Sequence, residues 1–252
     1  MHVVVTGASS GIGEAIAREY FSRNARVTLV ARRRELLEKL AVEGEKVHLV
    51  TADLSDPAQV TSWVDAAESA QGPIDVLINN AGVQIVRPFI ETPFEDGARL
   101  IQVDLLAPLQ LSHFVVKRMA ARGKGTLVDV SSMAAIAPTP GMSFYNAAKG
   151  GLAAFSEGLR AELKPQGVHV VTVYPGPVKT AMETAGRAAY EESWVARMLA
   201  SPGEASVLAR LVADAVEEKE ARVIYPFLNA LGRHFPAITR VVLDAFTPKI
   251  RT

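Results

Sequence analysis

A glycine-rich turn near the start of the chain places the strongest constraint on its fold. The segment Thr6-Gly7-Ala8-Ser9-Ser10-Gly11-Ile12-Gly13 follows an apolar run and precedes a segment with helical periodicity. At a strand-to-helix turn, backbone N–H groups and the helix dipole can receive a phosphate group. Glycine permits the positive φ angles and close approach that a side chain would block. The spacing differs from the GxGxxG pattern of other dinucleotide-binding proteins, so the turn by itself indicates only an anion site.

Other interpretations of this turn are weaker. The residues Gly7-Ala8-Ser9-Ser10-Gly11 formally satisfy GxSxG, the nucleophile elbow of α/β-hydrolases, but only one predicted strand precedes Ser9. An elbow needs several earlier strands to build its sheet and oxyanion hole. A nucleotide-triphosphate P-loop is excluded because no Lys followed by Ser or Thr closes the motif. A plain tight turn without a ligand stays open on this motif alone.

Short β-branched runs alternate with helix-period segments along most of the chain. This alternation is typical of parallel strands joined by helical crossovers. It predicts a Rossmann-type, doubly wound α/β fold with a seven-stranded parallel sheet and helices on both faces. The predicted strands are residues 2–5, 26–30, 46–50, 76–78, 126–130, 169–173 and 223–225, and the clearest helices are 12–23, 58–70, 97–121, 143–163 and 203–218.

The domain organisation expected from the sequence is simple. No linker interrupts the chain, so residues 1–252 are predicted to form a single domain. Pro- and Gly-rich segments follow two late strands, where ligand loops lie in doubly wound sheets, and residues 175–202 are interpreted as a substrate loop or lid. Residues 226–252 are an apolar tail, for which we rank a packed structural role first, a substrate or oligomer contact second and membrane binding last.

Composition excludes several classes of function. The 252 residues carry 27 basic and 27 acidic side chains, so a net charge of +0 gives no long-range field to gather nucleic acid. The absence of cysteine excludes disulfides and thiolate catalysis, and it favours a reducing compartment such as the cytoplasm. No secretory signal and no integral membrane segment are expected. No metal is predicted, because the histidines are scattered: His2, His48, His113, His169 and His234.

The end of the second predicted strand indicates which dinucleotide fits. NAD-binding proteins usually place Asp or Glu there to accept hydrogen bonds from the ribose hydroxyls. Here the sequence is Ala31-Arg32-Arg33-Arg34, with no acid, and a guanidinium group suits a 2′-phosphate. We therefore predict NADP (NADPH), with Arg32 as the main contact and Arg33 as support. A solvated basic run at the start of a helix is the alternative explanation.

Tyr145 and Lys149 are the candidate acid/base pair. They are four residues apart on a predicted helix, so they share one face. A nearby cation favours phenolate and is expected to lower the Tyr pKa from about 10 toward the range useful for acid/base catalysis. A surface helix pair would explain this spacing equally well. Ser131-Ser132, which closes the preceding strand, favours the catalytic interpretation by placing a hydroxyl near the same cleft.

Taken together, these motifs resemble those of the short-chain dehydrogenase/reductase family, in its branch of about this length. The matching residues, in the correct order within residues 2–225, are Thr6-Gly7-x-x-x-Gly11-x-Gly13, Asn79-Asn80-Ala81-Gly82, Ser132, Tyr145-x-x-x-Lys149 and Pro175-Gly176. The resemblance implies that Tyr145 exchanges a proton with the substrate oxygen and that Ser132 hydrogen-bonds this oxygen. It also implies that Lys149 holds the nicotinamide ribose and lowers the Tyr pKa.

The resemblance further implies a set of cofactor contacts. Asp53 and Leu54 would contact adenine, residues 79–82 would support the sheet and pass beside the adenosine, and Val178 and Thr180 would lie near the carboxamide. The complete expected set is Gly7, Ser9, Ser10, Gly11, Ile12, Gly13, Arg32, Arg33, Asp53, Leu54, Asn80, Ala81, Gly82, Tyr145, Lys149, Pro175, Gly176, Val178 and Thr180.

One position departs from the family pattern. Family members commonly carry Asn as a fourth catalytic residue in the helix before the fifth strand, and Asp104 occupies that place. In the family the backbone carbonyl there anchors a water in a proton relay to the Lys, so Asp can preserve the geometry. A buried carboxylate near Lys149 would also change how the site titrates. We expect Asp104→Asn to change the pH optimum with little loss of rate.

These features predict an NADP-dependent oxidoreductase that interconverts a ketone or aldehyde with its alcohol by direct hydride transfer. An apolar or lipid-like substrate, including a 3-oxoacyl thioester, is favoured by Met133, Ala134, Ile136, Ala137, Met142, Phe144, Ala181, Met182, Trp194 and Met198. A noncatalytic NADP-binding regulator should have lost Ser132, Tyr145 or Lys149, and a dehydratase or epimerase would need a further substrate domain.

An oligomer is also expected, because small residues on the predicted Tyr145 helix would let a neighbour approach closely. In the family such helices build homodimers and homotetramers, although packing on the chain's own sheet would use the same residues. The small residues are Ala147, Gly151, Ala154 and Gly158.

The cofactor assignment leads to a direct test. If Arg32 contacts a 2′-phosphate, Arg32→Asp should weaken NADP binding far more than NAD binding, because the new carboxylate repels the phosphate and can accept from ribose hydroxyls. Dissociation constants for both dinucleotides measure the effect. Equal losses of affinity would contradict the assignment.

Overall fold

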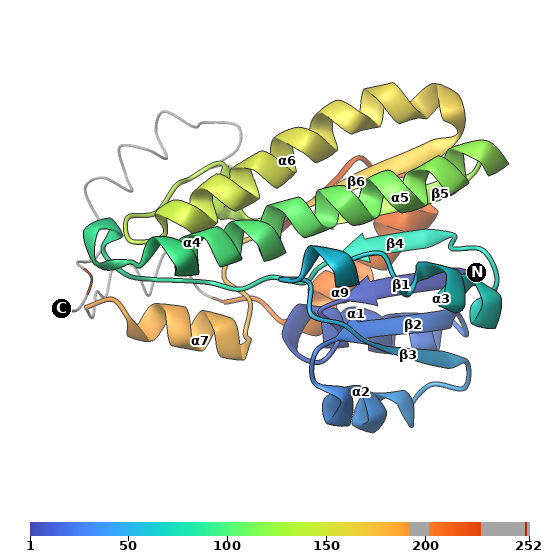
Figure 1. Ribbon diagram of the computed structural model, residues 1–252, viewed down its shortest axis with the longest axis horizontal. Coiled ribbons are helices and arrows are strands. Elements are labelled where there is room, and N and C mark those ends of the chain that lie inside the picture. Colours follow the sequence, from blue (N-terminus) through green and yellow to red (C-terminus); the bar gives the residue numbers. More distant parts are fainter. Residues whose placement is uncertain (192–201, 228–249, 251–252) are drawn as a thin grey trace.

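A computed structural model describes residues 1–191, 202–227 and 250 of the chain. These residues contain a seven-stranded, wholly parallel sheet in the order β3-β2-β1-β4-β5-β6-β7 (Figure 1). The predicted Rossmann-type sheet is therefore confirmed. Its strands are β1 (His2–Thr6), β2 (Arg26–Ala31), β3 (Val47–Thr51), β4 (Val76–Asn79), β5 (Gly125–Val130), β6 (Val168–Pro175) and β7 (Arg222–Tyr225).

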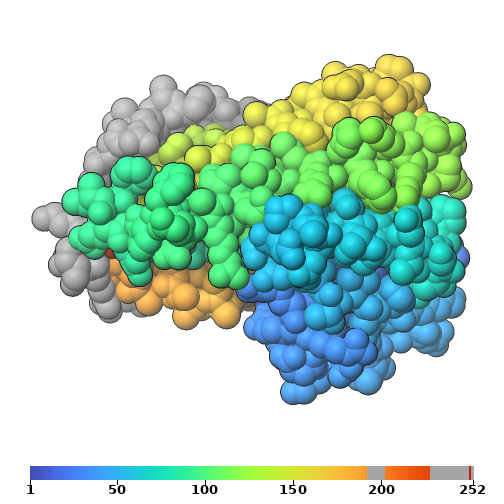
Figure 2. All heavy atoms as spheres, in the orientation of Figure 1, coloured from blue at the N-terminus to red at the C-terminus, as the bar shows by residue number. Residues whose placement is uncertain are grey.

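Helices cover both faces of the sheet, as the alternation in the sequence predicts. Helices α1, α2 and α9 pack on one face, and α3, α5 and α6 pack on the other. In Figure 2, α4 and α5 form the green layer that runs across the visible face of the molecule. The helices are α1 (Gly11–Ser22), α2 (Arg34–Ala41), α3 (Val64–Gln71), α4 (Phe94–Ile101), α5 (Ala107–Arg122), α6 (Ser143–Leu163), α7 (Ala181–Ala188) and α9 (Ala205–Glu217).

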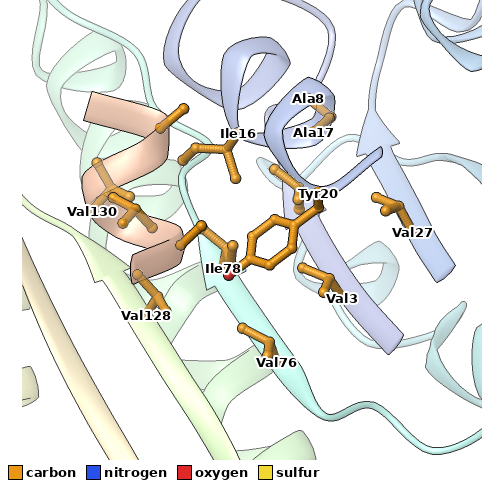
Figure 3. Close-up of a cluster of buried hydrophobic side chains, with 14 of the residues drawn as sticks. Val3, Ala8, Ile16, Ala17, Tyr20, Val27, Val76, Ile78, Val128 and Val130 are labelled. Carbon is orange, nitrogen blue, oxygen red and sulfur yellow. The ribbon is translucent and has the colours of Figure 1, made fainter. Parts of the chain in front are cut away.

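The core explains why the central strands are apolar without interruption. In β1, Val3 and Val5 face the α1 side while Val4 faces the α3 and α5 side, and all three are fully buried. Strands buried on both faces are expected to lack polar alternation. Figure 3 shows the buried hydrophobic cluster on the α1 side of the sheet, in which Ile16 and Tyr20 of α1 lie over the sheet residues.

The main departure from the predicted helices lies at 97–121. There α4 and α5 are separated by the π-helical segment η3 (Gln102–Leu106). Pro108, in the first turn of α5, has no N–H to donate to the carbonyl of Asp104, which is its partner in α-helical geometry. A π-helical turn accommodates this interruption, and such turns often mark functional sites.

Other helix boundaries differ less. The helix predicted at 58–70 begins only at Val64, because the short 3₁₀ helix η1 (Pro57–Gln59), capped by Asp56, occupies its start. The remaining 3₁₀ helices are η2 (Phe89–Glu91), η4 (Met133–Ala135) and η5 (Lys164–Gln166). The helix predicted at 143–163 is α6, with the same bounds.

Some sequence expectations lie outside the described residues. They include Trp194 and Met198 of the expected lid, His234, and the apolar tail apart from 226–227 and 250. The described part of the lid contains α7. Among the described helices, none combines the length and apolarity that a membrane crossing requires.

The connection between α6 and β6 provides a stability test. Gly167 has a φ angle of +73°, and a Cβ atom placed on it would lie 2.1 Å from the carbonyl oxygen of Gly123. We expect Gly167→Ala to lower the free energy of unfolding by more than about 1 kcal/mol. In Gly150→Ala, the matched control within α6, the new Cβ meets no atom within 4 Å in the described structure, and alanine in place of glycine should raise the free energy of unfolding by up to about 1 kcal/mol. Urea denaturation measures both; similar effects would contradict this account.

Candidate active site

The glycine turn and the segment after β4 are locked together at the carboxyl ends of β1 and β4. The hydroxyl of Thr6 donates to the carbonyl of Ile78 (3.2 Å) and accepts the N–H groups of Asn80 (3.0 Å) and Ala81 (3.1 Å). A Cβ atom on Gly7 would lie 2.7 Å from the Cα atom of Ala81. The two backbones therefore approach each other closely, which explains why glycine is needed at this position.

The turn has the form of a phosphate cradle. Gly7 and Gly11 adopt φ angles of +67° and +63°, and the turn leads into the N-terminus of the 12-residue helix α1. A Cβ atom on Gly13 would lie 2.4 Å from both the carbonyl oxygen of Gly7 and the side-chain nitrogen of Asn80. The missing side chains therefore let the turn pack closely on itself and on the segment after β4, and a glycine turn at a helix N-terminus fits the pyrophosphate of a dinucleotide.

The two arginines after β2 contact different parts of the site. The guanidinium of Arg33 donates to the hydroxyls of both Ser9 and Ser10, each at 2.9 Å, and so lies over the glycine turn. Arg32 instead lines a cavity of about 270 Å³ beside α4. The other lining residues are Val83, Ile85, Arg87, Asp96, Arg99, Leu100 and Val103.

Asp53 lies between arginines from two parts of the chain. Its carboxylate is 3.7 Å from Arg99 of α4, and it also accepts from the N–H and hydroxyl of Ser55. Partial burial would raise the pKa of Asp53, but the Ser55 hydrogen bonds and the charges of Arg32 and Arg99 outweigh it and lower the pKa. Leu54, the other expected adenine contact, is buried beside this carboxylate.

The segment after β6 approaches the glycine turn from the other side. A Cβ atom on Gly11 would lie 3.2 Å from the methyl carbon of Thr180. The Thr180 hydroxyl accepts the N–H of Glu183 at 3.1 Å and so caps α7. Val178 is buried, and Pro175 and Gly176 lie at the end of β6.

The three candidate catalytic side chains meet at the end of β5. Ser132 follows β5 and caps η4, and its side chain hydrogen-bonds the phenol of Tyr145. Tyr145 and Lys149 lie on α6, and both are buried. The hydroxyl of Ser131 donates to the carbonyl of Lys149 at 2.8 Å, which fixes α6 against the strand.

Lys149 forms a buried ion pair with Asp104. Its ammonium lies 3.2 Å from one carboxylate oxygen of Asp104 and donates to the carbonyl of Val130, also at 3.2 Å. The other carboxylate oxygen of Asp104 accepts the N–H of Val83 at 2.8 Å. Burial would lower the pKa of Lys149, but the charges of Asp104, Tyr145 and Asp129 raise it. The ammonium is therefore strongly stabilised in its charged form.

The expected lowering of the Tyr145 pKa is wrong for this structure. Burial in an apolar cluster raises the pKa of the phenol, and the charge of Lys149 and the hydrogen bond from Ser132 only partly oppose this. Asp104 adds to the rise. The sequence shows the helical spacing of Tyr145 and Lys149 but not the desolvation or the nearby carboxylate.

Asp129 is a buried group that the sequence interpretation missed. Its carboxylate accepts the side-chain N–H of Asn79 at 2.8 Å, and Asn79 also donates to Ser112 at 2.8 Å. Asn79 thus supports the sheet, as the resemblance implies. Burial raises the pKa of Asp129 to about 6, although Asn79, Ser156 and Lys149 oppose the rise. A lone acid within the apolar strand β5 was the signal that could have revealed it.

Among residues 1–191, 202–227 and 250, no three histidine or acidic side chains are grouped as a metal site requires.

Comparisons with known proteins agree with this geometry. The family described as short chain dehydrogenase matches residues 1–191. The chain is 32% identical over 247 residues to the ketoacyl reductase HetN of Nostoc sp. (strain PCC 7120), a match that covers 95% of this chain and 84% of that protein. It is 31% identical over 189 residues to a dehydrogenase/reductase SDR family protein 7-like of Anopheles gambiae. That second match covers 71% of this chain and 60% of the Anopheles protein, which is less than two thirds of its length.

A solved structure gives the same result. A variant of the actinorhodin polyketide ketoreductase, solved with NADPH, superposes with a TM-score of 0.82 at 28% sequence identity. The superposition covers 89% of this chain and 95% of the ketoreductase.

Asp129 leads to a prediction about stability and pH. The folded Asp129 carboxyl keeps its proton up to about pH 6, whereas an unfolded Asp carboxyl has an ordinary pKa of 3.8. Between these values the folded state binds more protons, so stability falls as the pH rises through about 6. Asp129→Asn cannot titrate and should be more stable than the wild type by about 3 kcal/mol at about pH 8 and by about half of that at about pH 5. Urea denaturation at both pH values measures this; a gain independent of pH would contradict it.

Proposed function

The chain belongs to the short-chain dehydrogenase/reductase family, and from that premise we propose that it is an NADP-dependent oxidoreductase that interconverts a ketone or aldehyde with its alcohol. The observation that carries the proposal is the convergence of Ser132, Tyr145 and Lys149 at the end of β5, beside the glycine cradle. A noncatalytic NADP-binding regulator would have no need for a hydroxyl, a phenol and an ammonium in one buried cluster.

In this proposal the side chains act on the substrate oxygen. The Tyr145 hydroxyl donates its proton to the oxygen during reduction and takes it back during oxidation. Ser132, already hydrogen-bonded to the phenol, hydrogen-bonds the same oxygen and orients it. Lys149 holds its positive charge close to the phenol and stabilises the phenolate that remains after proton transfer. Bound NADPH would supply the hydride.

The choice of NADP is supported by the arginines after β2. The Arg33 guanidinium over Ser9 and Ser10 forms a cluster of donors to which a 2′-phosphate can bind, and Arg32 adds a second positive charge from the cavity beside α4. No acid stands at the end of β2 to accept from a free ribose 2′-hydroxyl. The relative with NADPH in its structure is consistent with this choice.

The remaining cofactor contacts follow from the elements that surround the turn. The backbone of residues 80–82 would lie beside the adenosine, and Asp53 and Leu54 would contact the adenine. Pro175, Gly176, Val178 and Thr180 would border the nicotinamide, since their segment reaches Gly11. Asp104 completes the proposed catalytic group through its contact with Lys149.

An apolar or lipid-like substrate, such as a 3-oxoacyl thioester, is the narrower proposal. Tyr145 lies in a buried cluster with Leu100, Ala134 and Met142, and the neighbouring Phe144 stacks near the rings of Phe89 and Phe94. These contacts surround the phenol with hydrocarbon. HetN is described as a ketoacyl reductase and the solved neighbour as a polyketide ketoreductase, which supports an acyl substrate.

Several broader features belong to the same proposal. We propose that residues 1–252 belong to one domain; the lid expected at 175–202 and the tail expected at 226–252 lie partly outside the described residues. A homodimer or homotetramer is supported by α6, where a Cβ atom on Gly158 would meet no atom of the described chain within 4 Å. The absence of cysteine supports a cytoplasmic location.

Removal of the phenol tests the catalytic role. Tyr145→Phe should lower the rate of carbonyl reduction by at least about 10²-fold, because the proton donor is lost. NADPH binding should be largely kept. Tyr20→Phe is the matched control: the Tyr20 phenol is buried in the α1 core, and no partner for its hydroxyl occurs in the described structure.

The assay follows NADPH oxidation with grouped ketones, aldehydes and acyl thioesters, and binding is measured by titration. Wild-type rates in Tyr145→Phe would contradict the mechanism. Tight NADPH binding without turnover of any substrate would favour the regulator.

A further inference from the structure

Lys149 has a buried counter-ion, the carboxylate of Asp104. Asp104 is fully buried and Lys149 is 4% exposed, and their charged atoms are 3.2 Å apart. Water therefore screens this pair weakly, and each charge acts strongly on its immediate surroundings. The nearest group whose protonation matters to the chemistry is the Tyr145 phenol, one helical turn before Lys149.

The position of the carboxylate is fixed by backbone contacts. Asp104 lies in the π-helical segment η3 and accepts the N–H of Val83 at 2.8 Å. A Cβ atom on Gly82 would lie 2.9 Å from the Asp104 carboxylate and 3.3 Å from the Lys149 ammonium. The missing side chain of Gly82 thus leaves just enough space for the pair, and the carboxylate cannot easily turn away from Lys149.

We propose that Asp104 is a positioning residue that sets the acid/base range of Tyr145: its carboxylate neutralises the Lys149 ammonium, so that the phenol keeps its proton to higher pH. The proposal rests on the proposed function, because it concerns the same phenol. It assigns Asp104 an electrostatic role that acts through Lys149 and does not require Asp104 to touch the substrate.

The charged groups around the phenol are few in the described structure. Lys149 on the same helix and Asp104 on η3 act on it electrostatically, and Ser132 after β5 hydrogen-bonds it. Asp129 of β5 faces Lys149 and acts on its charge. Lys149 lowers the pKa of Tyr145 and Asp104 raises it, so the two charges oppose each other.

Asp104 is charged over the pH range that matters. Burial raises the pKa of the Asp104 carboxyl above its ordinary value, and Lys149 and the N–H of Val83 oppose only part of this rise. A phenol titrates in the alkaline range, well above the range of a carboxyl paired with an ammonium. The carboxylate is therefore present wherever Tyr145 loses its proton.

Loss of the Asp104 charge should shift the pH dependence of both reaction directions toward lower pH. Reduction needs the protonated phenol and oxidation needs the phenolate, so one ionisation ends the first and begins the second. Removal of the Asp104 charge leaves the ammonium unopposed and stabilises phenolate. Reduction should then lose rate at a lower pH, and oxidation should reach its plateau at a lower pH.

The experiment titrates the phenol directly. The ultraviolet absorbance of tyrosinate is followed against pH without cofactor or substrate. For each protein, the titration curve of the same protein carrying Tyr145→Phe is subtracted, and the difference is the signal of Tyr145. In Asp104→Asn, Tyr145 should ionise about one pH unit lower than in the wild type. Glu95→Gln, which removes an exposed carboxylate from α4, should leave the titration unchanged.

A charge-free pair keeps the test decisive if Asp104→Asn does not fold. Asp104→Asn/Lys149→Met removes both charges, and buried ion pairs are often replaced by neutral pairs without loss of stability. If the Asp104 charge raises the ionisation pH of Tyr145, the phenol in this double variant should ionise at a lower pH than in Lys149→Met, which keeps the carboxylate. The same ionisation pH in both variants would overturn the proposal.

The pH profile supplies the second readout once a substrate is known. The alkaline limb of kcat/KM for reduction should move down by the same amount as the phenol titration in Asp104→Asn. A phenol that titrates at or above the wild-type pH in Asp104→Asn overturns the proposal. Because the titration uses no substrate, failure of the proposed catalytic function would appear only in the turnover assay and stays distinguishable.

Discussion

The close approach of two backbones at the carboxyl ends of β1 and β4 is the constraint on which the site depends. The chain leaves β1 toward β2 and β3 and later returns to β4 on the other side of β1, so these two ends are neighbours where the connections diverge. No Cβ fits between Gly7 and Ala81, or between Gly13 and Asn80. The hydroxyl of Thr6 holds the two segments together. The phosphate cradle and the segment that leads to Asp104 are thereby fixed relative to each other.

The second element of the site is a set of buried polar groups, each held by backbone or by another buried group. Lys149 contacts Asp104 and the carbonyl of Val130, while Ser131 binds the Lys149 carbonyl. Asn79 joins Ser112 to Asp129 beneath them. Such a network costs desolvation energy but holds its members in one geometry, which is what a preorganised acid/base site needs. The contact from Ser131 fixes α6, and with it the phenol, relative to the end of β5.

Much of the fold could be predicted because it depends on local patterns. The strands follow from β-branched runs, and α6 follows from helical periodicity between a Pro- and Gly-rich loop and the 3₁₀ turn at Lys164. The single helix predicted at 97–121 was wrong in its interior. The apolar pattern continues through η3 and so predicts an unbroken helix, but Pro108 removes one hydrogen-bond donor and the helix is interrupted there. In the site, the sequence placed Ser132, Tyr145 and Lys149 correctly near one another. It did not predict that Arg33 would bind Ser9 and Ser10 while Arg32 turns toward Asp53.

The sequence by itself determined the alternation of strands and helices, the glycine turn and the residue types available for chemistry, because these depend on neighbours along the chain. Only the tertiary structure decided the charge balance of the site. Asp104 and Lys149 are 45 positions apart in the sequence, yet they form one buried pair, and Asp129 joins them from a third element. Ionisation depends on desolvation and on the distance between charges in space. Neither quantity is encoded in spacing along the chain, so the expected low Tyr145 pKa could be corrected only in the folded protein.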